Sequence, residues 1–416
     1  MMKETEMKRV PKLRFPEFTD DWEQRKLGEL IKNISTGKSV NSNDELVSDE
    51  DIAVLKTSCV SNDRFDSTEC KRVIEGEVEF VKCPIKKDNV IVSRMNTPER
   101  VGACGYIAEN HDNLFLPDRL WQLKFKEEVS AYYIYIMLIS TAYKNEIRSM
   151  ASGTSSSMYN IPQDRFLNLH MRITPSKAEQ EAIGRYFSRL DHLITLHQRK
   201  LEKLKKLRKG MMQKLFSQEI RFKADDGSEF PKWEEKKLGD VTSQYKVRNK
   251  KRLPLEIYSV NNIVGFIPQS EQFDDAGYLK DTDTSIYMVV PPKHFAYNPA
   301  RLDIGSIGYQ CLDHDVQVSS LYEVFETSDL VNDRFLWSWF HTYYFNNVVK
   351  RLQEGGVRLY FYYDKMQEVK IRLPSLPEQQ KIADCLSSLD DGIAKQKATL
   401  AAWEELKKGL LQQMFV

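Results

Sequence analysis

The chain of 416 residues has little net charge, few cysteines and no long apolar run. Its 61 basic and 60 acidic residues leave a net charge of +1, so the total gives no general attraction to nucleic acid or to an anionic membrane. The longest apolar run, 131–143, has 13 residues. A membrane-spanning helix needs about 20. We therefore expect a soluble protein whose basic surfaces are local.

The six cysteines form no CxxC pair, and the first ten residues lack the apolar stretch of a signal peptide. We interpret the six cysteines as reduced thiols of a cytoplasmic protein. The seven histidines are scattered without metal-ligand spacing, so we expect no metal site. The length and a hydrophobic content of 41% predict a globular protein of several domains.

The second half of the sequence repeats the first. Segments 175–216 and 374–415 align without gaps at an offset of 199, with 15 of 42 positions identical. Two shorter matches support the repeat. In the first, Phe15-Pro16 pairs with Phe230-Pro231 and 22–29 pairs with 233–240; in the second, 102–106 pairs with 305–309. The material between these matches has diverged. The matching segments are called the frame here, and the diverged segments between them the inserts. The sequence is therefore a duplicated frame with two different inserts.

The two longest repeated segments are predicted to be helices. Ser176-x-x-Glu179 and Ser375-x-x-Glu378 fit the capping box that opens a helix. Apolar residues then recur at alternating spacings of four and three, which is typical of a coiled coil. The predicted seam consists of Ile183, Leu190, Ile194, His197, Leu201, Leu204, Met211, Leu215, Ile382, Leu389, Ile393, Gln396, Leu400, Trp403, Leu410 and Met414.

Polar residues interrupt both seams at equivalent places, His197 with Gln396 and Arg208 with Lys407. This favours two helices built for each other over two unrelated amphipathic helices that each cover their own domain. Each would be about 60 Å long at 1.5 Å per residue. We expect the pair to act as a spacer.

Between the frames, short strand-like runs are followed in each half by one helical stretch, 131–149 and 331–352. The predicted fold class is α+β, with two repeated domains and an antiparallel coiled coil in a pseudo-two-fold arrangement. The predicted boundaries are 1–174 for the first domain, 175–218 for the first helix, 219–373 for the linker and second domain, and 374–416 for the second helix.

Loops rich in basic, amide and aromatic residues are the candidate DNA contacts, because such side chains pair with phosphates and base edges. Each loop alone is a weak signal, since many solvated loops share this composition. The candidates are Arg94, Asn96, Arg100, Ser152, Thr154, Ser155, Ser156, Tyr159, Asn160, Lys246, Arg248, Asn249, Lys250, Lys251, Arg252, Arg301, Arg358, Tyr360 and Tyr362.

The first long helix is much more basic than the second. Segment 177–214 has 11 basic and 4 acidic residues, and 378–408 has 5 and 6. Its cluster could contact phosphate or could simply be a solvated face. The cluster is Arg199, Lys200, Lys203, Lys205, Lys206, Arg208 and Lys209.

Sequence signatures of catalysis are missing. There is no N/D-P-P-Y/F tetrad, no phosphate-binding Walker loop and no serine-nucleophile signature, and Asp118 with Lys124 lacks the second acid of a nuclease site. We predict a binding protein rather than an enzyme.

The repeated motifs resemble the specificity subunit of type I restriction-modification enzymes over nearly the whole chain. The segments that carry the resemblance are 11–18, 22–27, 175–183, 190–191, 209–216, 227–238 and 374–415. The resemblance implies two target recognition domains, each reading one half of a split double-stranded DNA site, and helices that set the spacer and dock two modification subunits.

The same resemblance implies two restriction subunits as further partners. It also implies that S-adenosylmethionine, ATP and Mg bind to partner subunits and that this chain binds no cofactor. Two other hypotheses stay open. One is a DNA-acting enzyme that works alone, either a diverged nuclease or a diverged methyltransferase. The other is a coiled-coil scaffold without a DNA function.

Overall fold

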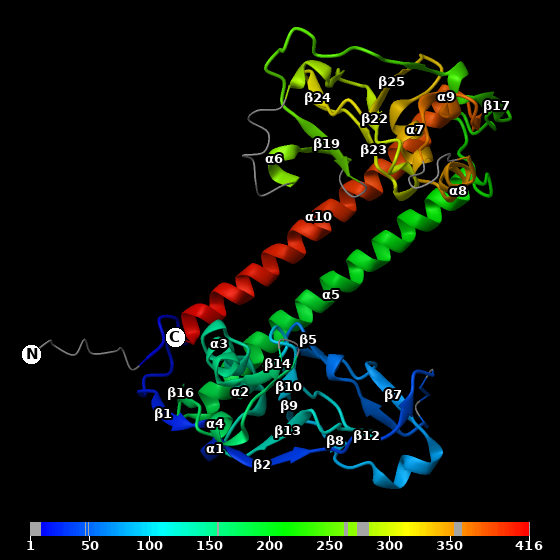
Figure 1. Cartoon of the computed structure of the whole chain (residues 1–416). Coiled ribbons are helices and arrows are strands. Elements are labelled where there is room, and N and C mark those ends of the chain that lie inside the picture. The colour runs from blue at the N-terminus through cyan, green and yellow to red at the C-terminus, as the bar shows by residue number, and fades with distance from the viewer. Residues whose placement is uncertain are drawn as a thin grey trace, which may run out of the picture. The chain divides into compact units, whose positions relative to one another are not determined.

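The computed structural model describes residues 10–45, 47–48, 50–155, 158–261, 265–272, 283–352 and 360–415. The chain forms two compact units (Figure 1). Unit 1 comprises residues 1–198 and 398–416, and unit 2 comprises 199–397. Each unit contains one part of each of the two long helices, α5 (Lys177–Phe216) and α10 (Leu376–Met414). The two helices start and end within two residues of the segments predicted to be helical.

Unit 1 is a set of small sheets covered by helices. Its strands are β1 (Glu23–Lys26), β2 (Ile31–Thr36), β3 (Ser42–Asn43), β4 (Ala53–Leu55), β5 (Val60–Ser61), β6 (Arg64–Phe65), β7 (Cys70–Val73), β8 (Pro84–Ile85), β9 (Val90–Ser93), β10 (Met95–Asn96), β11 (Cys104–Tyr106), β12 (His111–Phe115), β13 (Leu120–Phe125), β14 (Ser152–Ser155), β15 (Met158–Asn160) and β16 (His170–Ile173). Its short helices are α1 (Leu27–Leu30), α2 (Ala131–Leu138), α3 (Thr141–Met150) and α4 (Gln163–Leu167).

Unit 2 follows a related plan. Its strands are β17 (Glu234–Lys237), β18 (Thr242–Gln244), β19 (Tyr258–Asn261), β20 (Gly265–Pro268), β21 (Met288–Val290), β22 (Phe295–Tyr297), β23 (Ile307–Tyr309), β24 (Val316–Val318), β25 (Glu323–Thr327) and β26 (Lys370–Leu373). Its short helices are α6 (Gln269–Gln272), α7 (Asp333–Phe340), α8 (Tyr343–Leu352) and α9 (Tyr363–Met366).

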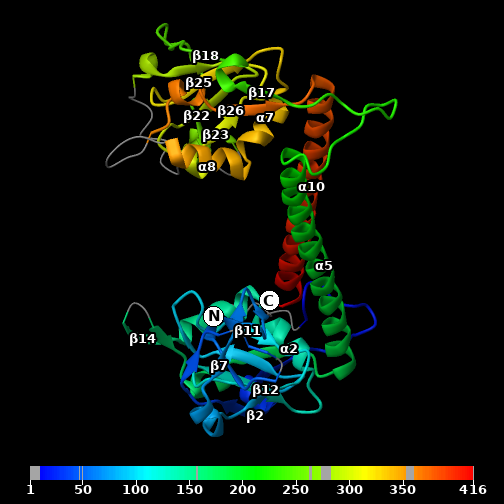
Figure 2. The same ribbon diagram turned by 90° about the vertical axis from the view of Figure 1, so that its right-hand side faces the viewer.

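The central sheet is the same in both units. Unit 1 has the strand order β11-β9-β13-β2, and unit 2 has the equivalent order β23-β22-β25-β18. An antiparallel pair also recurs, β1 with β16 and β17 with β26, and Figure 2 shows the second pair beside the start of α10. Strand β9 is buried along its whole length, as its apolar Val-Ile-Val run requires. The α+β class with two repeated domains and two long helices is therefore confirmed.

The two predicted helical stretches differ from the prediction, because each is a pair of helices. The first breaks between α2 and α3 at Ile139 and Ser140, and the second between α7 and α8. At the second break the Thr342 hydroxyl accepts the N–H of Phe345 at 3.3 Å and donates to the carbonyl of Trp339 at 2.7 Å. Hydroxyl side chains compete in this way with helical backbone bonds, so they end one helix and start the next.

The long helices take part in the core of each unit. In unit 1, Phe187 and Leu190 of α5 share an apolar core with Leu411 and Met414 of α10. In unit 2, Met212 and Leu215 of α5 share a core with Ile382 and Leu386 of α10. The start of one helix thus packs beside the end of the other, which is the antiparallel pairing predicted. No helix in the described part of the chain has the length and apolar character needed to cross a bilayer.

Candidate nucleic-acid interface

In unit 1 the structure joins the two predicted DNA-contact loops in one small sheet. The segment after β9 forms β10, which pairs with β15 so that Met95 lies opposite Asn160 and Asn96 opposite Tyr159. Strand β14 completes the sheet and lies at the edge of the unit (Figure 2). Residues 94–96 and 158–160 are therefore neighbours in space although more than 60 residues separate them in sequence.

Two polar groups at this junction have no hydrogen-bond partner among the residues that the structure describes. The Nε of Arg94 and the Oδ1 of Asn160 are buried without a hydrogen bond. The Arg94 guanidinium lies 5.9 Å from the centre of the Trp121 ring. The backbone carbonyl of Arg94 accepts the N–H of Ile161 at 2.9 Å. A buried unpaired polar group costs about 1–3 kcal/mol. Such atoms are typical of a surface that a polar ligand completes.

The other candidates of unit 1 differ in exposure. Asn96 is buried and donates to the Ser93 hydroxyl at 3.0 Å, so its side chain holds the loop. Arg100 and Ser152 are exposed, and Tyr159 is half-buried. Strand β14 contains Thr154 and Ser155, of which only the backbone is described, and Ser156 lies outside the described residues.

Unit 2 has an equivalent junction. The N–H of Phe361 donates to the carbonyl of Pro299 at 3.0 Å, which repeats the bond between Ile161 and Arg94. This bond places Tyr360 and Tyr362 close to the loop of Arg301, which is exposed. The two tyrosine rings stack, with centres 5.5 Å apart and planes 8° apart. Tyr362 is exposed and Tyr360 is half-buried, and stacked rings open on one side suit a base or sugar face. Arg358 lies outside the described residues.

The basic loop of unit 2 is anchored separately. Arg248 forms an isolated bridge with Met288, and the N–H of Asn249 donates to the carbonyl of Tyr287 at 2.9 Å. The Asn249 side chain is buried and closes the loop by accepting the N–H of Leu253. Asn249 therefore positions its neighbours rather than facing solvent.

Exposed cations surround that anchor. Arg248, Lys250, Lys251 and Arg252 line one shallow depression together with Ser285 and Ile286. Lys246 is also exposed. Arg252 lies 3.4 Å from Asp283, whose pKa is lowered by hydrogen bonds from Ser285. In the described part of the chain the other four cations form no ion pair, so their charge is available to an anion.

Sequence reasoning missed two arginines beside the unit 1 sheet. Arg148 on α3 donates from Nη2 to the carbonyl of Glu99 at 2.7 Å, and its Nε is buried with no hydrogen-bond partner in the described ranges. Arg119 is exposed, and its carbonyl accepts the N–H groups of Arg94 and Met95. Both lie outside the loops singled out by composition. The sequence around a helical arginine such as Arg148 gives no local signal that its side chain lies beside a candidate DNA-contact loop.

Each unit also contains a buried ionic clamp that fixes the entrance segment to a long helix. Arg14 donates from Nε and Nη2 to the two carboxylate oxygens of Glu179, at 2.6 and 2.8 Å, and Trp22 adds a third bond. Both Glu179 and its counterpart Glu378 are 0% exposed. The hydrogen bond to Glu179 raises the pKa of Arg14 above its ordinary value.

The clamp of unit 2 corrects two predictions. Arg221 donates to both oxygens of Glu378, and Trp233 donates to Oε2 at 3.2 Å. The structure therefore matches Arg14-Phe15 with Arg221-Phe222, not Phe15-Pro16 with Phe230-Pro231, because the turn bridged by Lys223 and Glu229 is extra. Neither glutamate closes a capping box. The arginine is the stronger partner because its bond is bidentate and charged.

The predicted seam residues are all buried or half-buried. Those under 9% exposed are Ile183, Leu190, Ile194, Leu201, Leu215, Ile382, Gln396 and Met414, and the half-buried ones are His197, Leu204, Met211, Leu389, Ile393, Leu400, Trp403 and Leu410. In unit 1 the rings of His197 and Trp403 stack with centres 6.3 Å apart. Near the end of α5, Met212 is more buried than the predicted Met211, as expected where 3.6 residues per turn replace 3.5.

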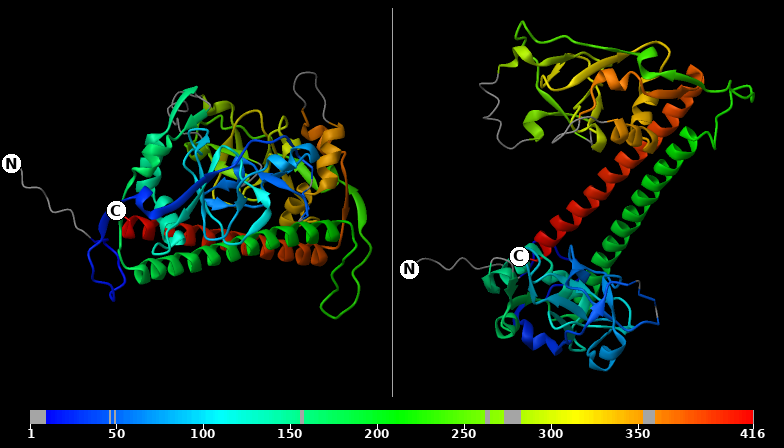
Figure 3. Two further views of the ribbon diagram at one scale, coloured as in Figure 1. Left: turned by 90° about the horizontal axis from the view of Figure 1, so that it is seen from below. Right: turned by 45° about the vertical axis from the view of Figure 1, so that its right-hand side comes forward.

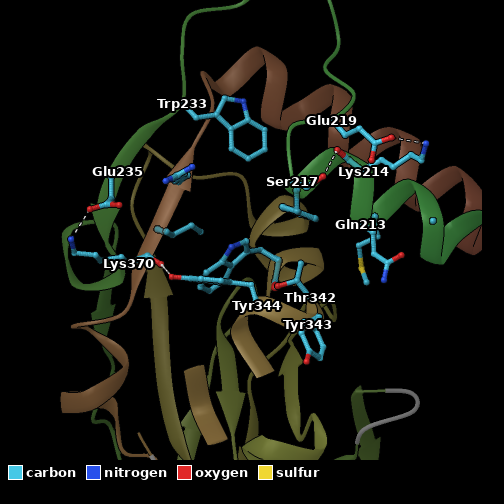
Figure 4. A pocket seen from close by; sticks show the side chains of 16 residues that line it. Gln213, Lys214, Ser217, Glu219, Trp233, Glu235, Thr342, Tyr343, Tyr344 and Lys370 are labelled. Carbon is cyan, nitrogen blue, oxygen red and sulfur yellow. Dashed lines mark hydrogen bonds and ion pairs between the residues drawn. The ribbon is translucent and has the colours of Figure 1, made fainter. Parts of the chain in front are cut away.

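Each unit has an open pocket at the junction of its entrance strand and the end of a long helix. The pocket of unit 2 measures about 730 Å³ and is lined by Trp233, Glu235, Tyr343, Tyr344, Lys370 and the last turns of α5 (Figure 4). The pocket of unit 1 measures about 550 Å³ and is lined by the equivalent Trp22, Gln24, His170, the start of α3 and the end of α10. The duplicated frame therefore builds one pocket twice.

Comparison with known proteins identifies the family. Residues 19–206 and 231–402 match the family described as "Type I restriction modification DNA specificity domain", which covers most of the chain. The chain belongs to this family. In the described part of the chain, no group of three or more His, Cys, Asp or Glu side chains is arranged to hold a metal ion.

Relatives carry matching names. Aligned over 95% of its length, the chain is 23% identical to a protein of Methanocaldococcus jannaschii named for the MjaX type I restriction enzyme specificity subunit, 93% of which it covers. It is 22% identical over 67% of its length to the MjaVIII specificity subunit of the same organism, covering 68% of that protein. The chain is a specificity subunit, the component of a type I restriction-modification system that recognises DNA and carries no catalytic role.

Two solved structures share the fold. The S subunit of a type I restriction-modification system from M. genitalium matches 98% of this chain and 99% of its own, with a TM-score of 0.59 and 18% identity. A chain from a study of complex assembly and conformational transition in the type I R-M system matches 95% of this chain and 97% of its own, with a TM-score of 0.55 and 13% identity. Specificity subunits act on DNA together with modification and restriction subunits.

Proposed function

We propose that this specificity subunit reads a bipartite DNA site, with unit 1 recognising one half and unit 2 the other. The observation that carries the proposal is the pairing of a repeated scaffold with different loops. The central sheets have the same strand order, while the candidate contacts are a small sheet with Arg94 and Asn160 in one unit and a tyrosine stack with a basic loop in the other. Different loops on the same scaffold favour different half-sites.

The second part of the proposal concerns partners. Two modification subunits dock on the duplicated frame and supply S-adenosylmethionine, and each flips and methylates an adenine in one half-site. Two restriction subunits supply the ATP- and Mg-dependent cleavage. The pocket that recurs beside Trp22 and Trp233 supports two equal docking sites, because each is built from the parts of the frame that repeat. We place this complex in the cytoplasm.

A domain exchange tests the assignment of half-sites. Residues 20–170 are replaced by the equivalent insert of a relative with a different target, and the methylated genomic sequence is mapped. We expect one half of the motif to change and the other to stay, since unit 2 is untouched. The reciprocal exchange of residues 233–370 is the matched control and changes the opposite half. A change in both halves from either exchange contradicts separate reading.

A further inference from the structure

The two long helices differ in charge on the face directed away from the seam. On α5 this face has Arg199, Lys203 and Lys206, spaced by four and three residues, with Lys200 at its edge. Three or four residues bring side chains back to one side of a helix. The buried Leu201 lies on the opposite side. All four cations are exposed, so the face is a strip of positive charge open to solvent.

The four cations of this strip have no acidic partner among the residues that the structure describes. In the described part of the chain, none of the four cations forms an ion pair, whereas the neighbouring Lys205 pairs with Glu202 at 2.6 Å. Like charges three or four residues apart destabilise a helix. The helix therefore retains an unfavourable arrangement that an anionic ligand would relieve.

The repeat provides an internal comparison. At an offset of 199, the four cations correspond to Ala398, Thr399, Ala402 and Glu405 on α10. The frame around them is kept, with Leu201 matching Leu400 and Lys209 matching Lys408. The positive strip is thus confined to one helix of an otherwise repeated pair.

A surface for a partner that docks twice should recur in both repeats, as the two pockets do. A surface present once suits a ligand present once, and in the proposed complex that ligand is the DNA duplex. We propose that this face of α5 contacts the phosphate backbone of the spacer between the two half-sites. The inference rests on the proposed bipartite reading, because only that reading gives the complex a spacer. Arg199 to Lys206 extends about 10 Å along the helix, the length of about three base pairs.

The test grafts the α10 residues onto α5. The variant combines Arg199→Ala, Lys200→Thr, Lys203→Ala and Lys206→Glu in the full chain, assembled with its modification subunits. Binding to a duplex with the target site is measured over a range of salt concentrations. The salt slope is the magnitude of the decrease in log K per unit of log salt concentration, and each lost phosphate contact lowers it by about 0.9. We expect the slope to fall by about 2–4, with the methylated sequence unchanged.

Two controls make the result specific. Lys205→Ala with Lys209→Ala removes two cations from the adjoining side and should leave the slope unchanged. A duplex with neutral methylphosphonate linkages in the spacer alone should lower the slope for the native complex and not for the graft. Both results together assign the lost contacts to spacer phosphates.

Other outcomes overturn the inference. An equal slope for the graft and the native complex shows that the strip does not contact DNA. Loss of a modification subunit from the graft, with an unchanged slope for the complexes that remain, shows that the strip binds protein instead. If the native complex methylates an undivided sequence, the proposed function fails, and the difference in salt slope between the graft and the native complex still reports whether the strip contacts phosphate.

Discussion

Asp191 and Lys407 form an ion pair of 2.7 Å in unit 1, and their counterparts repeat it with the helices exchanged. Asp390, 199 residues after Asp191, pairs in unit 2 with Arg208, which is 199 residues before Lys407. Each long helix therefore gives an acid to one unit and a base to the other. The cations are the polar interruptions of the predicted seam, and the structure assigns each its partner.

The two pairs should differ in strength. Asp191 and Lys407 are 20% and 15% exposed, whereas Asp390 is 48% exposed. We expect Lys407→Ala to lower the free energy of unfolding by about 1 kcal/mol and Arg208→Ala by less, because solvent screens the exposed pair. Urea denaturation with a double-mutant cycle measures both. The exchange of Asp191→Lys with Lys407→Asp is the control and should recover most of the loss; equal costs at both sites would contradict the exposure argument.

Removing one partner of the ionic clamp should have a larger effect. Arg14→Ala leaves the fully buried carboxylate of Glu179 with Trp22 as its remaining donor, and breaking a buried pair in this way costs about 3–5 kcal/mol. Adding Glu179→Gln to Arg14→Ala removes the buried negative charge together with the arginine, so the double variant should lose less stability than Arg14→Ala alone. Thermal unfolding with limited proteolysis measures the change in unit 1. The equivalent Arg221→Ala is the matched variant for unit 2, and a cost below about 1 kcal/mol at both sites would show that the clamp is not structural.

Unit 2 should lose stability in mild acid through His341. Burial is the main cause that lowers the pKa of His341 below its ordinary 6.5, and Arg208 adds to it. Between the lowered folded pKa and 6.5, the unfolded chain binds a proton that the folded chain does not, so stability falls as pH drops below about 6.5 and is fully present above it. Urea midpoints at pH 5.5 and 7.5 test this. His341→Gln should reduce the difference between them, and an unchanged difference would assign it to the carboxylates.

The pocket of unit 2 can be tested through its most exposed aromatic side chains. Tyr343 and Tyr344 are 76% and 54% exposed, so replacing both with Ser should change stability by less than about 0.5 kcal/mol. If a modification subunit docks there, its dissociation constant rises in the variant. Leu321→Ser removes an equally exposed apolar side chain elsewhere in unit 2 and serves as the control. Equal binding by the native chain and the tyrosine variant would exclude this docking site.

The length of α5 should control the spacer of the target. A duplicate of Lys203–Lys206 adds about 6 Å and about one turn, so it moves one end of the helix with little rotation. We expect a spacer longer by one or two base pairs, with both half-sequences unchanged, at about 3.4 Å per base pair. Methylation mapping measures it. The variant Leu207→Ala leaves the helix length unchanged and should keep the native spacer. An unaltered spacer in the insertion variant would show that another part of the complex sets the spacer length.

The long helices of the frame were predictable, whereas the positions and exposure of the candidate DNA contacts were only partly so. Helix bounds follow from local periodicity, which is why α5 and α10 were placed within two residues. The break between α7 and α8 depends on the hydroxyl of Thr342, and the clamp joins Arg14 to Glu179 across 165 residues. Interactions over such separations leave no local pattern. Composition likewise singled out Asn249 and Asn96, because it does not distinguish an amide that faces solvent from one that closes a loop.

The N- and C-terminal segments meet in unit 1 (Figure 3). The N–H of Leu13 donates to the carbonyl of Gln413 at 3.3 Å, and the equivalent bond in unit 2 joins Ile220 to Lys214 at 3.2 Å within an unbroken stretch of chain. The two ends of the chain therefore meet at a place that corresponds to a continuous stretch of chain in unit 2. A permuted gene that fuses the old ends and begins near residue 219 would encode the same network of bonds. Two identical copies of a half-length ancestor would form the bond of Ile220 to Lys214 between copies, before a fusion of the genes joined them.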